Sequence, residues 1–335
     1  MRIAVDAMGG DFAPQEIVQG AVEAARVLDA VSRILLVGDE PAVKAELARH
    51  SGVSDKIRVV HASESIGMDE APAHAIRRKK DSSIGKAVDL VKQGEADAVV
   101  SAGNTGAVVV AATLKLRMLD GVERPAIATI MPTQKNPFVL IDAGANTDSS
   151  PELLQQFAVM GSVCARVVLG RPEPVVGLLN IGTEEGKGNE VAKAAFRLLS
   201  QSGLNFRGNV EGHDLFEGET DVVVSDGFVG NVVLKTSESA ATAIAHWIKQ
   251  EFKRNPIRIL GAILLSGALK AIKRRLDPEM YGGAQLLGVR GICIITHGAS
   301  SSRAIFHAIR VACEAQQHHM NELITKNIAA LATKS

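Results

Sequence analysis

Short runs of apolar residues recur along the chain, and each run ends in a polar residue beside glycine. The runs are RIAVDAMGGD, RILLVGD, DAVVSAGNTGA, FVLIDAGANTD, VVGLLNIGTEEGKGN, DVVVSDGFVGN and GICIITHGASSSR. Continuous apolar runs without alternation are typical of parallel strands buried on both faces, and the segments between them have the character of crossover helices. The pattern therefore predicts a doubly wound α/β sandwich.

The polar residues at the ends of these runs indicate where a ligand binds. In open α/β sheets, ligands lie outside the carboxyl ends of the strands, where loop amides and helix N-termini converge. We therefore expect the glycine-rich loops to meet at one edge of the sheet and to form one cleft. Taken singly, Asp6, Asp142 and Asp226 are explained as helix caps. So many polar loops at one predicted edge favour a binding site.

The stretch from Ser237 to Gly283 departs from this pattern. A long helical segment, SESAATAIAHWIKQEFKRN, meets Pro256 and continues as IRILGAILLSGALKAIKRRLDP. It predicts a helical hairpin, residues 237–283, within a single catalytic unit of residues 1–335. We expect its base to pack against a second subunit and its tip to lie on an anionic membrane surface. The expected membrane contacts are Leu260, Ile263, Leu264 and Leu265.

The composition bears on which partners the protein binds and in which cell compartment it lies. Hydrophobic residues make up 46% of the chain, and its 37 basic residues balance its 37 acidic ones, so no global field recruits nucleic acid. One Trp and one Tyr leave few platforms on which bases could stack. The three cysteines form no C-x-x-C pair, and no secretory leader precedes the first strand. These features predict a cytoplasmic protein without a nucleic-acid partner.

The motifs argue against a covalent intermediate and against a nicotinamide cofactor. The chain has no G-x-S-x-G elbow, and neither its cysteines nor its histidines show a local catalytic signature. The dinucleotide fingerprint fails because Val191 occupies its third glycine position. We therefore expect no cofactor and no bound metal.

One loop comes close to the phosphate-binding motif G-x-x-x-x-G-K-[ST]. Gly182, Gly186 and Lys187 have the right residue types, but the glycine spacing is one residue short, and Gly188 replaces the hydroxyl that would hold magnesium. Glycine amides and one lysine still favour an anion. The loop therefore points away from a magnesium nucleotide and toward a smaller phosphate ligand.

A basic stretch, AIRRKKDSS, offers a second place for an anion. From charge alone, Arg77 to Lys80 are best explained as a solvated helix face. Ser82 and Ser83 directly after the cations, ahead of another helix, would suit a small tetrahedral anion.

These motifs, in this order, resemble the PlsX family of phosphate acyltransferases almost from end to end. The matching segments are DAMGGD, RRKKDSS, SAGNTGA, ERPAIA, DAGANTD, QQFAVMGSV, GLLNIGTEEGKGNE, DVVVSDGFVGNVVLKT, YGGAQLLGVRG and THGASSS. The spacing of Asp226, Gly230, Asn231 and Lys235 is also similar to a pattern of phosphate acetyltransferases, D-x-x-x-G-N-x-x-x-K. Those enzymes share the fold of isocitrate and isopropylmalate dehydrogenases.

The resemblance implies that architecture, a homodimer, and transfer of a fatty acyl group from acyl carrier protein to inorganic phosphate. The acyl phosphate product would then feed a membrane-bound glycerol-3-phosphate acyltransferase. Phosphate is itself a nucleophile, so the enzyme needs only to position it against the thioester and to stabilise developing charge. This agrees with the missing nucleophilic side chain.

Site residues follow from the matched motifs. We expect catalytic roles for Asn104, Asn146, Lys187, Asp226, Asn231 and His297. Binding of phosphate or the acyl group is expected from Gly9, Gly10, Asp11, Lys79, Ser82, Ser83, Gly103, Thr105, Asp142, Gly182, Asn189, Lys235, Gly298 and Ser300. In this hypothesis Lys79, Ser82, Ser83 and Lys187 hold phosphate, the three asparagines Asn104, Asn146 and Asn231 are polar contacts, and His297 protonates the leaving sulfur.

Three alternatives remain open from the sequence. A coenzyme A-dependent phosphate acyltransferase for short chains would share most of the cleft. A metal-dependent hydroxyacid dehydrogenase would share the fold, and a cofactor absorbance assay would detect it. The third alternative is a non-enzymatic, membrane-associated scaffold, which would show no phosphate-dependent loss of thioester.

Overall fold

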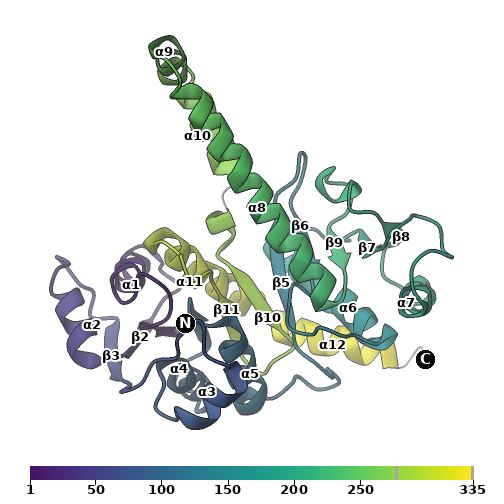
Figure 1. The fold of residues 1–335 in the computed structure, drawn as a ribbon. Coiled ribbons are helices and arrows are strands. Elements are labelled where there is room, and N and C mark those ends of the chain that lie inside the picture. The colour runs from purple at the N-terminus through teal and green to yellow at the C-terminus, as the bar shows by residue number, and fades with distance from the viewer. Residues whose placement is uncertain (276–277, 333–335) are drawn as a thin grey trace.

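The computed structural model describes residues 1–275 and 278–332. Their strands form one eleven-stranded sheet in the order β3-β2-β1-β4-β11-β10-β5-β6-β9-β7-β8 (Figure 1). The strands are β1 (Arg2–Asp6), β2 (Arg33–Gly38), β3 (Ile57–His61), β4 (Ala98–Ser101), β5 (Ala126–Met131), β6 (Phe138–Ile141), β7 (Val176–Leu179), β8 (Phe206–Val210), β9 (Val222–Val224), β10 (Ala284–Leu287) and β11 (Ile292–Ile295).

Helices separate most of these strands along the chain. They are α1 (Gln15–Val27), α2 (Glu40–Leu47), α3 (Pro72–Arg78), α4 (Ser83–Lys92), α5 (Thr105–Leu116), α6 (Pro151–Val168), α7 (Glu190–Gln201), α8 (Gly227–Phe252), α9 (Pro256–Leu264), α10 (Ser266–Arg275), α11 (Ser302–Gln317) and α12 (Met320–Ala332), with short 3-10 turns η1 (Asp214–Phe216) and η2 (Pro278–Tyr281).

The sheet consists of two parallel halves that run in opposite directions. Strands β3, β2, β1, β4 and β11 are parallel to one another, and β6, β9, β7 and β8 form a second parallel set. Between them, β10 and β5 pair antiparallel with their neighbours. The carboxyl ends of the two sets therefore lie at opposite edges of the sheet. The prediction that all polar loops meet at one edge is wrong.

The reversal of direction has a local cause. Residues 132–137 are the whole connection between β5 and β6. A parallel crossover needs a dozen or more residues, so this short connection forces an antiparallel pair. An apolar run shows that a strand is buried, but it does not show the direction of that strand.

The apolar runs are buried on both faces, as predicted. Every residue of β4, β6, β9 and β11 is buried. One apolar core joins the sheet to α1, α6, α11 and α12, and the other joins its opposite face to α3, α4 and α5. The α/β sandwich expected from the sequence is confirmed, with a mixed sheet in place of an all-parallel one.

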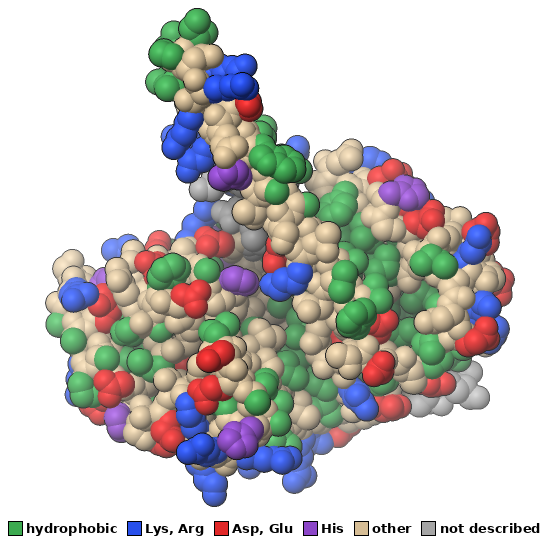
Figure 2. Space-filling model, viewed as in Figure 1, with side chains coloured by type: hydrophobic (Ala, Val, Ile, Leu, Met, Phe, Trp, Pro, Cys, Tyr) green, Lys and Arg blue, Asp and Glu red, His purple; other side chains and the backbone are tan. Residues whose placement is uncertain are grey.

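The helix α8 begins at Gly227, before the predicted start of the hairpin at Ser237, and continues beyond the sheet. With α9 and α10 it forms a projecting arm (Figure 1). Figure 2 shows hydrophobic side chains at the outer end of the arm, with Lys and Arg beside them. Residues 276–277, within the predicted hairpin, lie outside the described residues. Among the helices that the structure describes, none is long and apolar enough to cross a membrane.

Candidate functional site

The loops that follow β1, β4 and β11 contact one another, and we call them the first loop cluster. It consists of residues 6–14, 101–105 and 296–301. A Cβ atom on Gly9 would lie 2.6 Å from the amide nitrogen of Gly103, and one on Gly10 would lie 2.8 Å from the carbonyl oxygen of Gly298. Gly10 also has a φ of 97°. These backbones approach too closely for side chains, which explains the glycines.

The buried carboxylate of Asp6 anchors this cluster. Its Oδ2 accepts a hydrogen bond from the Ser101 hydroxyl at 2.7 Å, and its Oδ1 accepts one from the Met8 amide at 3.2 Å. Burial raises the pKa of Asp6 above its usual value, and hydrogen bonds from Ser83 and Ser101 act in the opposite direction. Sequence reasoning treated Asp6 only as a cap, and it missed this anchoring role.

Asn104 has a structural role at the start of α5. Its Oδ1 accepts from the Ala107 amide at 3.0 Å, which caps the helix. Its Nδ2 lies within hydrogen-bonding distance of three carbonyl oxygens, those of Gly67, Met68 and Glu70. The side chain is buried and fully engaged, so it ties the loop before α3 to the first loop cluster.

Other groups of the cluster face solvent. His297 is exposed, and its Nδ1 accepts from the Ala299 amide at 3.2 Å. This bond places the proton of the neutral imidazole on Nε2. Thr105 is also exposed, and its amide and that of Gly106 open helix α5, where they have no intrahelical acceptor. A donor side chain and free helix amides therefore belong to adjoining loops.

A second loop cluster lies at the opposite edge of the sheet, after β6 and β9. It consists of residues 142–146 and 225–231. The Asp142 carboxylate accepts hydrogen bonds from the backbone amides of Ile127, Gly144, Ala145 and Asn146, and from the Asn146 side chain. Burial raises the pKa of Asp142 above its usual value, and these donors oppose the shift. Asp142 and Asn146 are therefore framework residues of this cluster.

Helix α8 starts in this second cluster. Asp226 caps it, because its Oδ1 accepts from the Val229 amide at 2.8 Å. A Cβ atom on Gly230 would lie 1.9 Å from the carbonyl oxygen of Asp142, so only glycine allows the helix to approach the strand this closely. Two residues of the phosphate acetyltransferase-like pattern thus position the helix.

The other two residues of that pattern face outward. Asn231 and Lys235 are exposed one turn apart on α8, and Lys235 pairs with Glu238 at 2.9 Å. From the second cluster, α8 runs toward the opposite edge of the sheet (Figure 1). Both side chains therefore face solvent near the start of α8, beside the second loop cluster.

The loop between β7 and α7 is solvent-exposed. Lys187 Nζ lies 3.9 Å from Glu184 Oε1, and the Lys187 amide donates to the Glu184 carbonyl at 3.1 Å. A Cβ atom on Gly182 would lie 2.8 Å from Cγ of Lys187, so the lysine chain folds over this glycine. Asn189 caps α7. The loop belongs to the second parallel set, so it lies at the edge opposite the first loop cluster.

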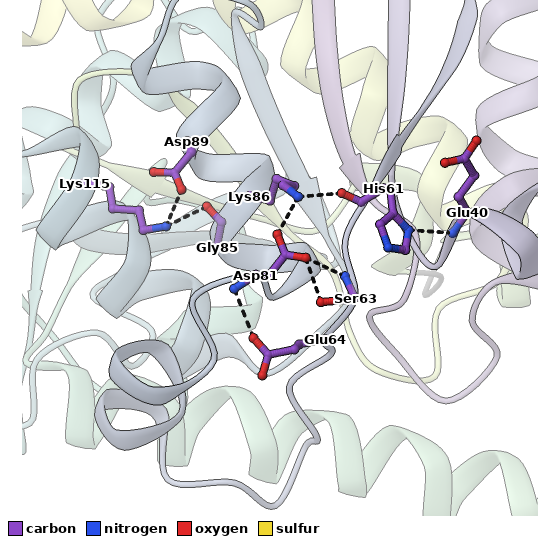
Figure 3. Close-up of polar contacts among 9 residues, drawn as sticks. All are labelled: Glu40, His61, Ser63, Glu64, Asp81, Gly85, Lys86, Asp89 and Lys115. Carbon is purple, nitrogen blue, oxygen red and sulfur yellow. Dashed lines mark hydrogen bonds and ion pairs between the residues drawn. The ribbon is translucent and has the colours of Figure 1, made fainter.

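The basic stretch divides into buried and exposed parts. Ser82 and Ser83 are buried, and Lys79 pairs with Glu70 at 2.6 Å. Phosphate contact at Lys79 would require its ion pair with Glu70 to open, whereas the buried Ser82 hydroxyl has no hydrogen-bond partner among the described residues. The stretch is braced by Asp81, which accepts from the Ser63 amide and hydroxyl at 2.8 Å each and pairs with Lys86 (Figure 3).

The cysteines are core residues, as predicted. All three are buried, and burial raises the pKa values of Cys164 and Cys293 to about 12. Neither thiol can supply a thiolate nucleophile near neutral pH.

One group of potential metal ligands lies elsewhere, in the loop after β8. Glu211, His213 and Asp214 place ligand atoms within 4.8 Å of one another. His213 Nε2 and Asp214 Oδ1 are 2.9 Å apart and already pair with each other. The group belongs to neither loop cluster.

The structure thus brings Gly9, Gly10, Asp11, Gly103, Thr105, His297, Gly298 and Ser300 together through the β1, β4 and β11 loops. It places Asp142, Asn146, Asp226 and Asn231 in a separate group, and Gly182, Lys187 and Asn189 in a third. The sequence does not predict that Glu70 pairs with Lys79 or that Glu184 pairs with Lys187. Nothing in the local sequence pairs these carboxylates with their lysines, apart from the i,i+3 spacing of Glu184 and Lys187.

Comparison with known proteins shows which family the chain resembles in sequence. Residues 1–323 match the family described as fatty acid synthesis protein. The phosphate acyltransferase of Pelotomaculum thermopropionicum is 51% identical over 334 residues, which cover 100% of this chain and 97% of the relative. The phosphate acyltransferase of Desulfitobacterium hafniense strain DCB-2 is 51% identical over 329 residues, 98% of each chain.

Solved structures share the architecture at low identity. A phosphotransacetylase from Streptococcus pyogenes superposes with a TM-score of 0.61 at 17% identity, over 95% of this chain and 94% of that one. A 4-hydroxythreonine-4-phosphate dehydrogenase from Klebsiella pneumoniae gives 0.51 at 15% identity, over 96% and 99%. These likenesses confirm the expected fold, which acyltransferases and dehydrogenases share. The sequence relatives go further, and the chain belongs to the PlsX family of phosphate acyltransferases, the fatty acid synthesis protein family.

Proposed function

We propose that this acyltransferase moves a fatty acyl group from acyl carrier protein to inorganic phosphate, which attacks the thioester directly. The products are acyl phosphate and the free carrier thiol. The observation that carries this proposal is the first loop cluster, where the exposed Thr105, the free amides of α5 and His297 lie on adjoining loops. Family membership in the phosphate acyltransferases removes the dehydrogenase and scaffold alternatives.

A covalent acyl-enzyme is not required for this reaction. Phosphate is largely dianionic near neutral pH, so it can attack the thioester itself. When the enzyme holds phosphate in line with the thioester carbonyl, the entropic cost of bringing the two reactants together is met on binding. Because burial keeps Cys164 and Cys293 protonated, neither thiol competes with phosphate as nucleophile. Phosphate oxygen forms the new C–O bond, and the thioester C–S bond breaks.

In this proposal the amides at the start of α5 bind the phosphate or the carbonyl oxygen that becomes negative. Helix N-termini favour anions, and the loss of one oxyanion donor typically costs about 3 kcal/mol. Nε2–H of His297 donates a hydrogen bond to the leaving sulfur, and the proton that completes the carrier thiol comes from the attacking hydrogen phosphate. Asn231 and Lys235 of α8 supply further polar contacts to the substrate in this proposal.

The arm serves dimerisation and membrane contact in the same proposal. Its residues expose large apolar side chains, among them Trp247 at 62% and Leu264 at 78%. An apolar groove of ≈430 Å³ lies between α8, α9 and α10, bordered by Lys249 and Lys253. We propose that the base packs against a second subunit. The tip would rest on anionic lipid, where a membrane-bound glycerol-3-phosphate acyltransferase receives the acyl phosphate.

The test is acyl phosphate formation from acyl-acyl carrier protein and inorganic phosphate, with and without added metal. We expect product without added metal, and His297→Gln should lower turnover because it displaces the Nε2–H donor. Acyl-CoA as donor distinguishes the coenzyme A-dependent alternative. Absence of acyl phosphate with folded protein would overturn the proposal.

A further inference from the structure

The cations of the RRKK segment differ in their partners. Lys79 pairs with Glu70 at 2.6 Å and donates to the Ser65 carbonyl at 2.7 Å. Arg77, Arg78 and Lys80 are exposed, and they form no ion pair within the part of the chain that the structure describes. Arg78 joins Lys79, the main cause, in lowering the pKa of the Glu70 carboxyl. Figure 2 shows Lys and Arg side chains gathered at the lower edge of the molecule, where α3 lies in Figure 1.

The acidic residues that follow this segment are already paired. Asp81 binds Lys86 and the Ser63 hydroxyl, and Asp89 binds Lys115 at 2.6 Å (Figure 3). These carboxylates therefore do not neutralise the three exposed cations. On a chain with equal numbers of acidic and basic residues, the three cations form a local positive surface. We call Arg77, Arg78 and Lys80 the α3 basic surface.

This surface is fixed beside the first loop cluster. The loop before α3 is held by Asn104, whose Nδ2 contacts the carbonyl oxygens of Gly67, Met68 and Glu70. A Cβ atom on Gly106 would lie 2.5 Å from Cγ of Pro72, so α3 starts directly against α5. The residue that caps α5 in the cluster thus also positions the basic helix.

We propose that the α3 basic surface docks an acidic face of the protein that carries the acyl thioester. The proposal rests on the proposed function and names the face at which its donor binds. Three exposed cations of one sign fit a complementary macromolecular surface, which steers association and orients the thioester toward the adjoining cluster. The arm projects from the other side of the molecule (Figure 2), so a bilayer at the tip would not reach α3.

The test reverses the three charges together, in the variant Arg77→Glu/Arg78→Glu/Lys80→Glu. We expect the KM for acyl-acyl carrier protein to rise about tenfold or more, and its dependence on salt to weaken. The kcat, the KM for phosphate and the rate with a carrier-free acyl thioester should stay unchanged. Arg33→Glu, which reverses an exposed cation at the start of β2, is the matched control and should change none of these values.

A second measurement does not depend on turnover. Fluorescence anisotropy of labelled holo-acyl carrier protein should show tight binding to wild type and to Arg33→Glu, and weakened binding to the triple variant. An unchanged carrier KM and affinity would overturn the docking proposal even if acyl phosphate forms. If the triple variant loses the same activity with carrier-bound and with carrier-free thioester, the substitutions damage the enzyme in general, and the docking proposal is overturned. If the triple variant loses only its binding to anionic vesicles, the α3 basic surface binds lipid instead, and the docking proposal is likewise overturned. If wild type makes no acyl phosphate, the proposed function fails, while the anisotropy still decides the docking.

Discussion

At the scale of single residues, two buried aspartates organise the loops. Asp6 and Asp142 each follow or end a strand, and each accepts hydrogen bonds from the loop that comes next. A buried carboxylate is costly unless several donors satisfy it. Both residues are therefore better explained as loop anchors than as groups that touch substrate.

Asp6 should make stability depend on pH. Burial raises its folded pKa above the ordinary value of 3.8, so its favourable contribution is complete below the unfolded pKa and is lost as pH rises through the folded value. We expect the unfolding free energy of wild type to fall relative to that of Asp6→Asn over the pH range that begins at the ordinary carboxyl pKa of 3.8 and extends upward from it. Urea unfolding of both proteins across this range measures the difference. A difference that does not change with pH would contradict the expectation.

The two candidate phosphate sites can be separated by a pair of substitutions. Thr105→Val removes a hydroxyl from the first loop cluster, and Lys187→Ala removes a cation from the exposed loop after β7. We expect the first to raise the KM for phosphate about tenfold, as for a lost hydrogen bond to a charged group, and the second to leave it unchanged. Steady-state kinetics with varied phosphate decides. The reverse result would place phosphate at the loop of Lys187.

At the scale of elements, α8 connects the second loop cluster with the projecting arm. It begins against β6, where Gly230 approaches the Asp142 carbonyl, and it ends in the arm. The same helix therefore contributes to the second loop cluster and to the proposed dimer and membrane contacts. Its position depends on close packing at its first turns.

A side chain at Gly230 should displace this helix. A Cβ atom there would lie 1.9 Å from a backbone oxygen, which cannot move aside as a flexible side chain would. We expect Gly230→Ala to lower the free energy of unfolding by about 2–3 kcal/mol and to reduce activity. Gly261→Ala is the control, because its Cβ has no atom within 4 Å and alanine favours helix α9. Equal stability of the two variants in urea would contradict the packing argument.

The tip of the arm gives a prediction about lipid. Leu264 is 78% exposed, and burial of a leucine side chain contributes about 2 kcal/mol. We expect Leu264→Glu to weaken binding to anionic liposomes at least about tenfold in a flotation assay. Leu114→Glu changes an exposed leucine of α5, outside the arm, and should bind like wild type. Undiminished binding of Leu264→Glu would argue against contact between the tip and lipid.

At the scale of the whole molecule, the arm exposes many large apolar side chains, and we propose that a partner covers them. Large exposed apolar surfaces mark interaction sites in soluble proteins. On α8 the arm exposes Ile244, Trp247 and Ile248, and Ile248 lines the same groove as Ile259 and Ile263 of α9. We propose that the α8 side of the arm contacts a second subunit.

The single tryptophan of the chain would report on this proposed contact. Trp247 is 62% exposed in one subunit, so burial in a dimer should shift its emission to shorter wavelength. We expect dilution to shift the emission toward longer wavelength at the same concentrations at which sedimentation shows dissociation. Trp247→Phe should retain the sedimentation behaviour and lose the signal. Monomeric sedimentation at all concentrations would contradict the proposed dimer.

The sequence by itself determined seven of the eleven described strands, the fold class and the family. Apolar runs such as AVVS and FVLI specify burial through their composition, since each residue loses water contact wherever the strand lies in the sheet. The glycine positions were also informative, because a close backbone approach excludes every other residue. Long motifs in a fixed order were sufficient to indicate the acyltransferase family.

Only the tertiary structure decided which loops share a site. Strand direction depends on the connection between β5 and β6 and on the insertion of β10 between β11 and β5, neither of which an apolar run records. The sequence likewise does not show which of Arg77, Arg78, Lys79 and Lys80 forms an ion pair. Lys79 pairs with Glu70 only because the chain folds back on itself. Local composition determines what a segment buries, whereas charge pairing and the meeting of loops depend on contacts between distant parts of the chain.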